Sequence, residues 1–444
     1  MSKNIILNGG RLFEVLKYYY NTSNSDALPL YGFIAKPEKW DGEVPDPTGS
    51  SLEQKKLRKN IIFGKKIYAN GICPIVPRRD WTSGVVYDYS SNSENLFEYD
   101  SDGKIIKNFY VRNSSDQVFR CICNNNGSPS TIEPEITPSI PNIEKPIQLD
   151  DGYKWIYVTT MSRGNKVKFF DDEWMPISIS PYVKGLNPLE IGYGRIDAIN
   201  VLNGGSGYED GYTSVTVNIK GDGDIPAKAY AVVEGGAIKD VVVTESGGNY
   251  TYANVEFSST KGSGASAEVI LSPVHGSAHD PCYELGCNHV MLVFEFIGDE
   301  GGMLPEDVQY TQIGLLASPT DINNNDINGN KYVYYDKLKL ATGPQKFQIG
   351  ETIYQGRSLD TATYKASVCS IDNDNGFIYV VDRFGTPETN APIMGASSNS
   401  QRILLNRETP VIFPSSGLLI YQENVDTRNR EKNNNEQFRV IIRF

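Results

Sequence analysis

The chain has 444 residues and a formal net charge of −12, which argues against a protein that grips phosphate backbones, so we expect no nucleic-acid partner. No apolar run approaches the roughly 20 residues that cross a bilayer. Met1–Gly10 lacks the basic start and cleavage site of a signal peptide, so we expect no membrane insertion and synthesis in the cytoplasm. Six cysteines are too sparse for a disulfide scaffold, and we expect reduced thiols.

The composition predicts a mainly β (α+β) chain. Its 41 glycines, 24 prolines and 27 tyrosines favour many strands and turns over long helices. A chain of this length exceeds what one hydrophobic core usually serves. We therefore expect a multi-domain β-sandwich scaffold with a few short helices.

The first part of the sequence predicts a helix, then a strand, then a second helix. Arg11–Tyr20 carries apolar residues at helical spacing, and Ser51–Lys59 has the composition of a charged helix. Between them, Leu30–Ala35 is a short apolar run typical of a strand. Pro37–Trp40 then interrupts that strand with a turn.

The most particular stretch of the sequence is Cys73–Trp81. Two prolines fix its backbone and remove two hydrogen-bond donors, so it is not expected inside a central strand. Arg78, Arg79 and Asp80 then offer two guanidinium groups and a carboxylate for bidentate pairing, and Trp81 offers a ring that fills a pocket at a contact. This pattern predicts an anchor loop. A structural ion pair of the arginines with Asp80 or a neighbouring strand has equal weight.

Several strands and one long loop are expected after this stretch. The loop, Asn124–Pro146, is rich in asparagine, serine and proline and should be exposed and extended. A turn at Asp150–Gly152 precedes an aromatic strand that contains Trp155. The strands expected before the loop are Gly84–Tyr89, Phe109–Val111 and Gln117–Cys123.

Residues 196–271 contain an internal repeat. In each copy an alternating strand leads into a glycine-rich turn that ends in tyrosine, first at Gly204–Tyr208 and then at Ser246–Tyr250, and a second alternating strand follows. We expect a tandem β module. Glycine-tyrosine turns could present Tyr208 and Tyr250 to a sugar, but packing of the two rings over glycines is the favoured interpretation.

All three histidines lie in one short stretch together with two cysteines. Imidazoles and thiolates gathered so tightly can bind zinc, but the spacing matches none of the common zinc-finger patterns. The favoured interpretation is turn chemistry that leads into a buried strand at His289–Phe296, with no metal bound. The candidate ligands are His275, His279, Cys282, Cys287 and His289.

The last third of the chain predicts further β structure. Phe347–Ile403 has strands typical of a small barrel or sandwich. Strands are also expected in Tyr310–Pro319, in Gly417–Asn424 and, at the end of the chain, in Gln437–Phe444.

The sequence gives little support to catalysis, so no enzyme and no cofactor are expected. A serine or cysteine nucleophile would have to recruit one of the clustered histidines, and no nucleophile-elbow motif is present. Adjacent acidic residues, at Asp150–Asp151 and Asp171–Glu173, project in different directions and usually solvate a turn. Gly221–Asp224 resembles part of a calcium loop but lacks the remaining ligands, and a hairpin turn is expected there.

A family resemblance follows from these residues. Val76–Trp81 is similar to a hallmark of the gene-product-eight baseplate wedge subunits of contractile-tailed (myovirus) phages. The helix, strand, Pro-x-x-Trp turn and charged helix before it follow the order that this family shows. Further similar elements keep the family's order, with Thr311 where arginine is usual: Phe119–Cys121, Asp151–Trp155, Tyr310–Pro319 and Tyr421–Asn424.

The resemblance implies a structural virion protein of the tail baseplate, assembled in the host cytoplasm. Such a subunit is a homodimer that docks on other wedge proteins and takes part in baseplate assembly and tail contraction. We expect scaffold segments at 1–195, 273–345 and 406–444 and two inserted β modules at 196–272 and 346–405. Candidate interface anchors, which are equally compatible with core positions, are Trp40, Arg78, Arg79, Trp81 and Trp155.

Two other functions stay open from the sequence. The first is a tail-associated adhesin that binds host glycans through the inserted β modules, for which exposed aromatic rings on the repeats would be needed. The second is a metal-dependent hydrolase, which would need stoichiometric zinc with an open coordination position.

Overall fold

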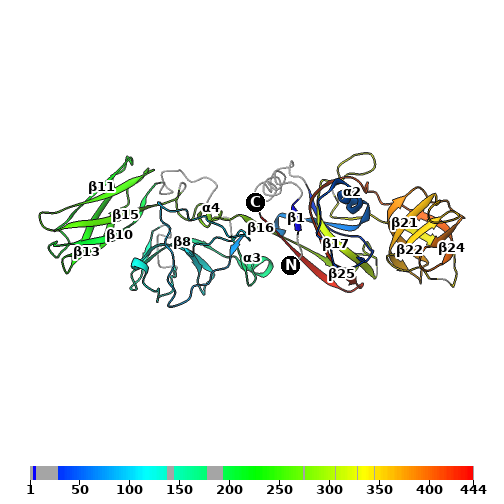
Figure 1. Cartoon of the computed structure of the whole chain (residues 1–444), viewed down its shortest axis with the longest axis horizontal. Helices are drawn as coiled ribbons and strands as arrows, with labels where there is room; N and C mark the ends of the chain where they lie inside the picture. The colour runs from blue at the N-terminus through cyan, green and yellow to red at the C-terminus, as the bar shows by residue number, and fades with distance from the viewer. Residues whose placement is uncertain are drawn as a thin grey trace. The chain divides into compact units, whose positions relative to one another are not determined.

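The computed structural model describes residues 4–6, 29–137, 145–177, 194–273, 276–305, 307–327, 329–344 and 346–443. The helix expected over Arg11–Tyr20 and the candidate ligand His275 lie outside these ranges. The described chain is mainly β, as predicted, with several antiparallel sheets and short helices (Figure 1). Among the described residues, no helix is long and apolar enough to cross a membrane. The helices are α2 (Ser51–Asn60), α3 (Arg163–Phe169), α4 (Pro281–Glu284) and the 3-10 turns η1 (Ala69–Gly71) and η2 (Asn125–Gly127).

The chain divides into two compact units. Unit 1 consists of Met1–Ile72, Leu292–Ile442 and Phe444, and unit 2 consists of Cys73–Met291 and Arg443. The chain passes between the units in strand β4 (Ile72–Pro77) and again in strand β16 (His289–Ile297).

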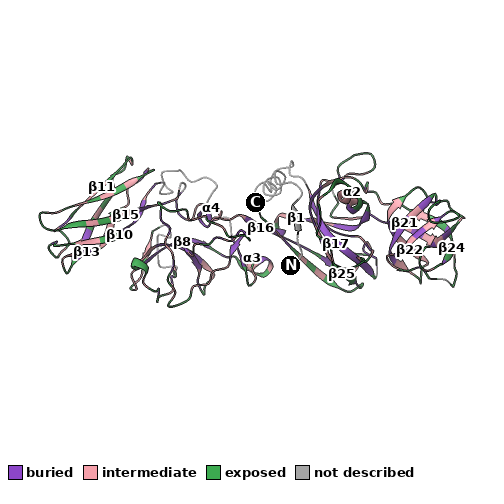
Figure 2. Cartoon of the chain, viewed as in Figure 1, coloured by how far each residue is buried: buried purple, intermediate pink, exposed green. Residues whose placement is uncertain are grey.

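Unit 1 contains a six-stranded antiparallel sheet. Its strand β17 is buried along its whole length because it runs through the middle of the sheet (Figure 2). Helix α2 covers part of this sheet with Leu57, which packs with Phe33 and Leu316. The strands, in spatial order, are β1 (Asn4–Ile6), β25 (Leu418–Arg430), β17 (Val308–Ala317), β2 (Leu30–Ala35), β3 (Ile61–Ile67) and β18 (Lys331–Val333).

Ser50 is the N-cap of α2. Its hydroxyl accepts a hydrogen bond from the Glu53 N–H at 3.2 Å, which satisfies one of the N–H groups that have no partner within the helix. The Glu53 carboxylate in turn accepts from the backbone N–H groups of Thr48 and Gly49 and holds the two residues before the cap.

A closed barrel forms a second part of unit 1 (orange in Figure 1). It begins at Asp336, before the expected module boundary at 346, so this boundary was placed too late. Lys337 pairs with Glu408, so the two ends of the barrel segment lie side by side, as an insertion requires. In order around the barrel, its strands are β19 (Asp336–Leu340), β22 (Phe377–Phe384), β21 (Tyr364–Asp372), β20 (Thr352–Gln355), β23 (Pro392–Gly395) and β24 (Gln401–Glu408).

Aromatic packing joins the unit 1 part of β16 to strand β26 (Asn435–Arg443). The rings of Phe294 and Phe438 stack with their centroids 4.8 Å apart. The strand expected at the end of the sequence is thus present.

Unit 2 contains a four-stranded sheet whose core is aromatic. Tyr87, Phe119, Tyr153 and Trp155 pack together there, and all four are almost fully buried. Strand β4 pairs separately with β9 (Trp174–Pro176). The strands of the sheet, in order, are β5 (Tyr110–Arg112), β6 (Gln117–Asn124), β8 (Tyr153–Thr160) and β7 (Ile147–Gln148).

The strand expected at Gly84–Tyr89 is not formed. This stretch is irregular because its backbone hydrogen bonds go to a loop and to a side chain rather than to a strand. The Gly84 N–H donates to the Ser130 carbonyl, and the Tyr87 N–H donates to the Tyr153 hydroxyl. The stretch nevertheless contributes to the core, because the Tyr87 side chain is buried there.

The tandem module of unit 2 forms a four-stranded sheet and a two-stranded sheet (green in Figure 1). The four-stranded sheet has the order β12 (Lys228–Glu234), β13 (Ala237–Glu245), β10 (Ile196–Ser206) and β15 (Ser263–Leu271). The two-stranded sheet consists of β11 (Thr216–Gly221) and β14 (Ala253–Ser258).

The two copies of the repeat are related by an approximate twofold axis. When Tyr208 is aligned with Tyr250, Ile199 corresponds to Val241, and these two residues pair with each other in the sheet. The same holds for β11 and β14, where Thr216 pairs with its counterpart Ser258. Since β10 pairs with β15 and β13 with β12, each copy completes the sheet of the other.

The tyrosines that close the repeats are buried over glycines, which confirms the favoured interpretation. Tyr208 and Tyr250 are each 7 % exposed. Their hydroxyls accept hydrogen bonds from equivalent backbone amides, at 3.3 Å from Ala265 and 3.0 Å from Ala227. The hairpin expected at Gly221–Asp224 is wrong, because this stretch connects strands that belong to different sheets.

Candidate interaction site around the Pro77–Trp81 loop

The loop after β4 is fixed by backbone hydrogen bonds on both sides. Pro77 pairs with Trp174 at the end of the strand, and the Arg78 N–H donates to the Glu173 carbonyl at 2.8 Å. On the other side, the Arg112 N–H donates to the Arg79 carbonyl at 2.7 Å, and the Trp81 N–H donates to the Arg112 carbonyl at 2.9 Å. The arginines and Asp80 are therefore held in defined positions between two strands.

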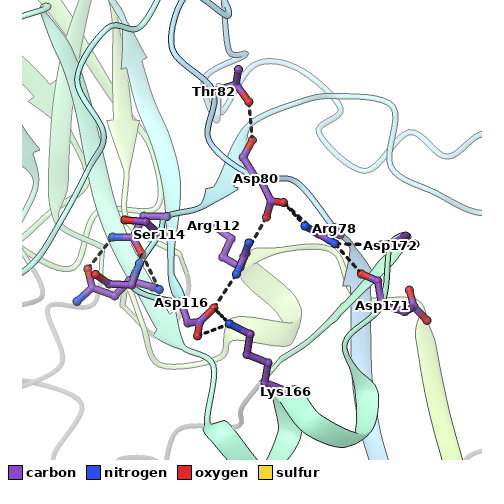
Figure 3. A network of polar contacts seen from close by, with 12 residues as sticks. Arg78, Asp80, Thr82, Arg112, Ser114, Asp116, Lys166, Asp171 and Asp172 are labelled. Atoms are coloured by element: carbon purple, nitrogen blue, oxygen red, sulfur yellow. Dashed lines mark hydrogen bonds and ion pairs between the residues drawn. The ribbon is translucent and has the colours of Figure 1, made fainter.

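Asp80 is the centre of an ion-pair network (Figure 3). Its carboxylate accepts from Arg112 Nε at 2.6 Å through one oxygen and from Arg78 at 2.6 and 2.8 Å through the other. The predicted ion pair between Arg78 and Asp80 is thus present, and Arg112 is a second partner that the sequence did not indicate.

The network continues beyond Asp80 in both directions. Arg112 also pairs with Asp116 at 2.6 Å, and the Lys166 ammonium lies 2.8 Å from the same carboxylate. At the other end, Arg78 donates to the Asp171 carbonyl at 3.1 Å. Cations and anions alternate along this chain, so each charge is opposed by its neighbours.

A single aromatic ring lies beneath three of the cations. The Phe170 ring centroid is 4.6 Å from the guanidinium carbon of Arg78, 4.9 Å from that of Arg112 and 5.7 Å from Lys166 Nζ. Attraction between a cation and an aromatic face holds the planar guanidinium groups against the ring. Phe170 therefore gives the charged side chains a common apolar support.

The electrostatics of Asp80 reflect two opposing effects. Burial by itself would raise the pKa of Asp80, but the hydrogen bonds from Arg112 and Arg78 outweigh it and hold this pKa below its usual range. The carboxylate is thus ionised at neutral pH, and its charge pairs are complete.

Arg79 and Trp81 point into the same unit. Arg79 donates to the Asn108 side chain at 2.7 Å and to the Ile105 carbonyl, and its guanidinium lies 5.2 Å from the Tyr110 ring. The Trp81 indole N–H donates to the Ser130 hydroxyl at 3.1 Å, and its ring packs against the aromatic core that contains Trp155.

The five predicted anchors are not all available to a partner. Trp155 is fully buried in the core, so for this residue the core position holds, which was the other of the two interpretations given for these residues. Trp40 lies in unit 1, where its indole N–H donates to the Val425 carbonyl at 3.1 Å and Lys36 packs over its ring. Arg78, Arg79 and Trp81 are half-buried and internally bonded.

The accessible surface beside the network comes from neighbouring residues. Val86, shortly after the loop, is 48 % exposed. The Asp172 side chain is fully exposed and lies 3.5 Å from Arg78. Single exposed apolar side chains are common on protein surfaces, so Val86 is a position at which a contact can be tested rather than evidence of one.

The histidine and cysteine cluster was a candidate metal site. In the part of the chain that the structure describes, which leaves out His275, no group of three or more histidine, cysteine or acidic residues is arranged to hold a metal ion. His289 packs against Trp174 with ring centroids 4.4 Å apart, and burial together with the charge of Arg443 lowers its pKa to about 4. The Cys287 sulfur lies 3.2 Å from the Ile75 carbonyl oxygen and 3.3 Å from that of His289, and its one S–H can donate to either. His279 and Cys282 lie in the turn and helix before these residues.

The sequence did not reveal the partners that complete the network: Arg112, Asp116, Lys166 and Phe170. Two of the contacts are local, since Arg112 pairs with Asp116 and Lys166 lies over the Phe170 ring, each at a spacing of four residues. The contacts of Asp80 with Arg112, of Asp116 with Lys166 and of Phe170 with the two arginines join residues that are distant in the chain, and only the fold brings them together. No family model matches the chain, and no curated protein matches it at a significant level.

Proposed function

We propose that the chain is a structural subunit of a contractile-tailed phage, part of the tail baseplate wedge, that assembles with other wedge proteins as a homodimer. The observation that carries this proposal is the location of the family-like segments. Most of them lie in strands of the two scaffold sheets, namely β2, β17 and β25 in unit 1 and β6 and β8 in unit 2, and none of them lies in the tandem module or in the barrel.

In unit 2, three family-like segments contact one another. The Trp81 indole bonds to Ser130, whose hydroxyl donates to the Asp151 carboxylate at 3.1 Å. Cys121 pairs with Trp155 between β6 and β8. The segments that resemble the family therefore form one packed region rather than scattered matches.

In unit 1, the other family-like segments are adjacent strands. β17 lies between β2 and β25, and Gln312 of β17 donates a side-chain hydrogen bond to Asn424 of β25 at 2.8 Å. Thr311, which replaces the usual arginine, is fully buried and donates to the Lys36 carbonyl at 3.0 Å. This position therefore has a structural role in the present chain.

The test is co-assembly of the purified chain with the other baseplate proteins encoded beside it, measured by size-exclusion chromatography with light scattering. Because Arg78 and Arg79 are bonded inside unit 2, alanine at these positions would disturb folding as well as binding. Val86→Glu instead alters an exposed side chain next to the loop. Ile225→Glu is a matched control, because Ile225 is 50 % exposed but belongs to the inserted module.

We expect the unchanged chain to be a dimer that joins a larger complex. Val86→Glu should weaken this joining at least tenfold, and Ile225→Glu should leave it unchanged. A stable monomer that joins no tail protein would contradict the proposed function. Equal effects of the two substitutions would contradict only the role of the loop surface.

The alternative of a glycan-binding adhesin loses its original basis. It required exposed tyrosines at the glycine-rich turns, and both Tyr208 and Tyr250 are buried. A saccharide site would have to use other aromatic residues.

A further inference from the structure

Cys282 and Cys287 lie at the two ends of the turn that closes helix α4. The helix ends at Glu284, and Gly286 follows it with a φ of 61°. The Cys287 N–H donates to the Cys282 carbonyl at 2.8 Å, and the Gly286 N–H donates to the Tyr283 carbonyl at 3.1 Å. These two hydrogen bonds around a glycine of positive φ are the Schellman arrangement of a helix C-terminus.

The Schellman arrangement brings the two cysteine side chains together. Residues at the positions of Cys282 and Cys287 contact each other in this motif, usually as an apolar pair. Two residues joined by a direct backbone hydrogen bond are also close enough for a disulfide, which needs Cα atoms roughly 4.4–6.8 Å apart. Both side chains pack against the same core cluster, which contains Val76, Ile105 and Phe109. The two sulfurs are therefore neighbours in the folded chain.

The turn that carries the cysteines is fixed by its surroundings. A Cβ atom at Gly286 would overlap the Phe97 ring and would lie 2.7 Å from Cδ1 of Ile105, so the turn lies directly against these side chains. The Cys287 sulfur lies 3.2 Å from the carbonyl oxygen of Ile75 in β4. Because the backbone is already held in place, joining the two sulfurs requires little rearrangement.

The Cys287 thiol has the features of a reactive cysteine. A hydrogen bond from the Cys282 side chain holds the pKa of Cys287 below its usual range and outweighs the opposing effect of burial. Burial instead raises the pKa of Cys121, Cys123 and Cys369. The thiolate is the nucleophile in disulfide exchange, and Cys282 and Cys287 are both only partly buried, so a small disulfide has access to them.

We propose that Cys282 and Cys287 form a disulfide within one chain when the protein meets a low-molecular-weight disulfide such as oxidised glutathione. The Cys287 thiolate attacks one sulfur of glutathione disulfide, whose S–S bond breaks and releases one glutathione thiolate. Cys282 then gives its proton to water and attacks the Cys287 sulfur, which forms the Cys282–Cys287 bond and releases the second glutathione. The two electrons that the protein loses reduce one glutathione disulfide to two thiols.

The disulfide would close the last turn of α4 covalently, just before the chain enters β16. Such a bond persists in an oxidising medium and is reduced in the cytoplasm. The inference is independent of the proposed role in the baseplate, because it rests on contacts within unit 2 alone.

The experiment uses the full chain in a buffer with an excess of oxidised over reduced glutathione. Remaining thiols are then blocked with iodoacetamide, and the tryptic peptides are identified by mass spectrometry. Cys282 and Cys287 fall in one peptide, 262–331, without any other cysteine. Cys121 and Cys123 share the peptide 121–154 and are an internal control, because burial raises the pKa of both.

We expect labelling of the peptide 262–331 to fall at least tenfold relative to the reduced chain and its mass to decrease by two hydrogen atoms. The peptide 121–154 should keep both labels, and dithiothreitol should restore labelling of the first peptide. In Cys282→Ser the exchange should stop after its first step, so that Cys287 retains one glutathione.

The unchanged chain alone decides the proposal, even if the serine variant folds poorly. Full labelling of the peptide 262–331 in the oxidising buffer would overturn it. A glutathione adduct that persists on the unchanged chain would overturn it as well, since the second cysteine would then be out of reach. So would disulfide-linked dimers on non-reducing electrophoresis, because the bond would then join two chains.

Discussion

Asp80 stabilises its loop through charge pairs that are only partly shielded from water. Its side chain is 35 % exposed, so screening by solvent reduces what each pair contributes. The contacts are still stronger than isolated surface pairs, because Arg112 and Arg78 approach the two oxygens in hydrogen-bond geometry and rest on Phe170. Removing the carboxylate would leave two neighbouring guanidinium groups facing each other.

Substitution of Asp80 by alanine should therefore lower the free energy of unfolding of unit 2 by about 1–2 kcal/mol. Guanidinium denaturation followed by tryptophan fluorescence suits this measurement, since Trp81, Trp155 and Trp174 all belong to unit 2. Asp172→Ala is the control and should not move the midpoint, because the Asp172 side chain is fully exposed. Equal midpoints for all three proteins would show that the network contributes nothing to stability.

The raised pKa of Glu284 makes the stability of the fold decrease as pH rises, whereas the lowered pKa of Asp80 makes it increase. Its pKa is about 8 in the folded chain and near 4.5 in an unfolded one, so the folded state holds a proton that the unfolded state releases between these values. The stability that the neutral carboxyl contributes is complete below about pH 4.5 and is lost as pH rises through about 8. Asp197, with a pKa of about 6, acts in the same direction over a lower range.

We predict that Glu284→Gln flattens the pH dependence of stability. In the unchanged chain, this group should make the free energy of unfolding fall by up to roughly 1.4 kcal/mol per pH unit within the window. Denaturation at pH 5, 6.5 and 8 measures the slope. The variant should keep the smaller dependence at lower pH, where the raised pKa of Asp197 and the lowered pKa of His289 act in opposite directions. Parallel curves for both proteins would refute a raised pKa at Glu284.

At the scale of elements, the twofold arrangement of the tandem module depends on two equivalent glycines. Gly205 has a φ of 65° and Gly247 a φ of 63°, in the left-handed region. A Cβ atom at Gly205 would lie 2.5 Å from the Ser263 carbonyl oxygen, and one at Gly247 would lie 2.6 Å from that of Ile225. Both contacts are with backbone, which cannot move aside without breaking strand pairing.

Gly205→Ala and Gly247→Ala should destabilise the module by similar amounts, about 2–4 kcal/mol, because strain and steric overlap add. Gly235→Ala is a matched control with a φ of 62° but no neighbouring atom within 4 Å, and should cost only about 1 kcal/mol. Hydrogen–deuterium exchange on the full chain would measure faster exchange in β10 to β15. A large asymmetry between the two equivalent sites would contradict the twofold arrangement.

Sequence patterns predicted the strands well where one local signal determined them. Alternation identified the repeat strands, and a long apolar run identified β16, which is buried over most of its length. The pattern failed at Gly84–Tyr89, where the same alternation packs side chains into the core without a strand partner. It also failed at Gly221–Asp224, because β11 pairs with the distant β14 rather than with the next strand.

The candidate site was predictable only in part, for the same reason. The residue order of the Pro77–Trp81 loop made it conspicuous, and one ion pair within it could be foreseen. Whether Trp155 is an anchor or a core residue depends on which strands cover it, and β6 and β7 flank it on both sides. Non-local contacts of this kind cannot be derived from spacing.

At the scale of the whole molecule, each unit combines a scaffold sheet with a self-contained module. Ile196 pairs with Leu271 at the ends of the tandem module, just as Lys337 pairs with Glu408 at the ends of the barrel. A module with adjacent ends can be gained without changing the path of the surrounding chain. We propose a role in assembly for the scaffold segments, on the basis of the similarity to wedge subunits that is expected for them from the sequence.

The most direct test of this account is to locate the chain on virus particles. Intact contractile tails would be labelled with gold-conjugated antibodies against the purified chain and viewed by electron microscopy. The account predicts label at the baseplate end of the tail. Label confined to another part of the particle, or tails that contain none of the chain by mass spectrometry, would contradict a role in the baseplate wedge.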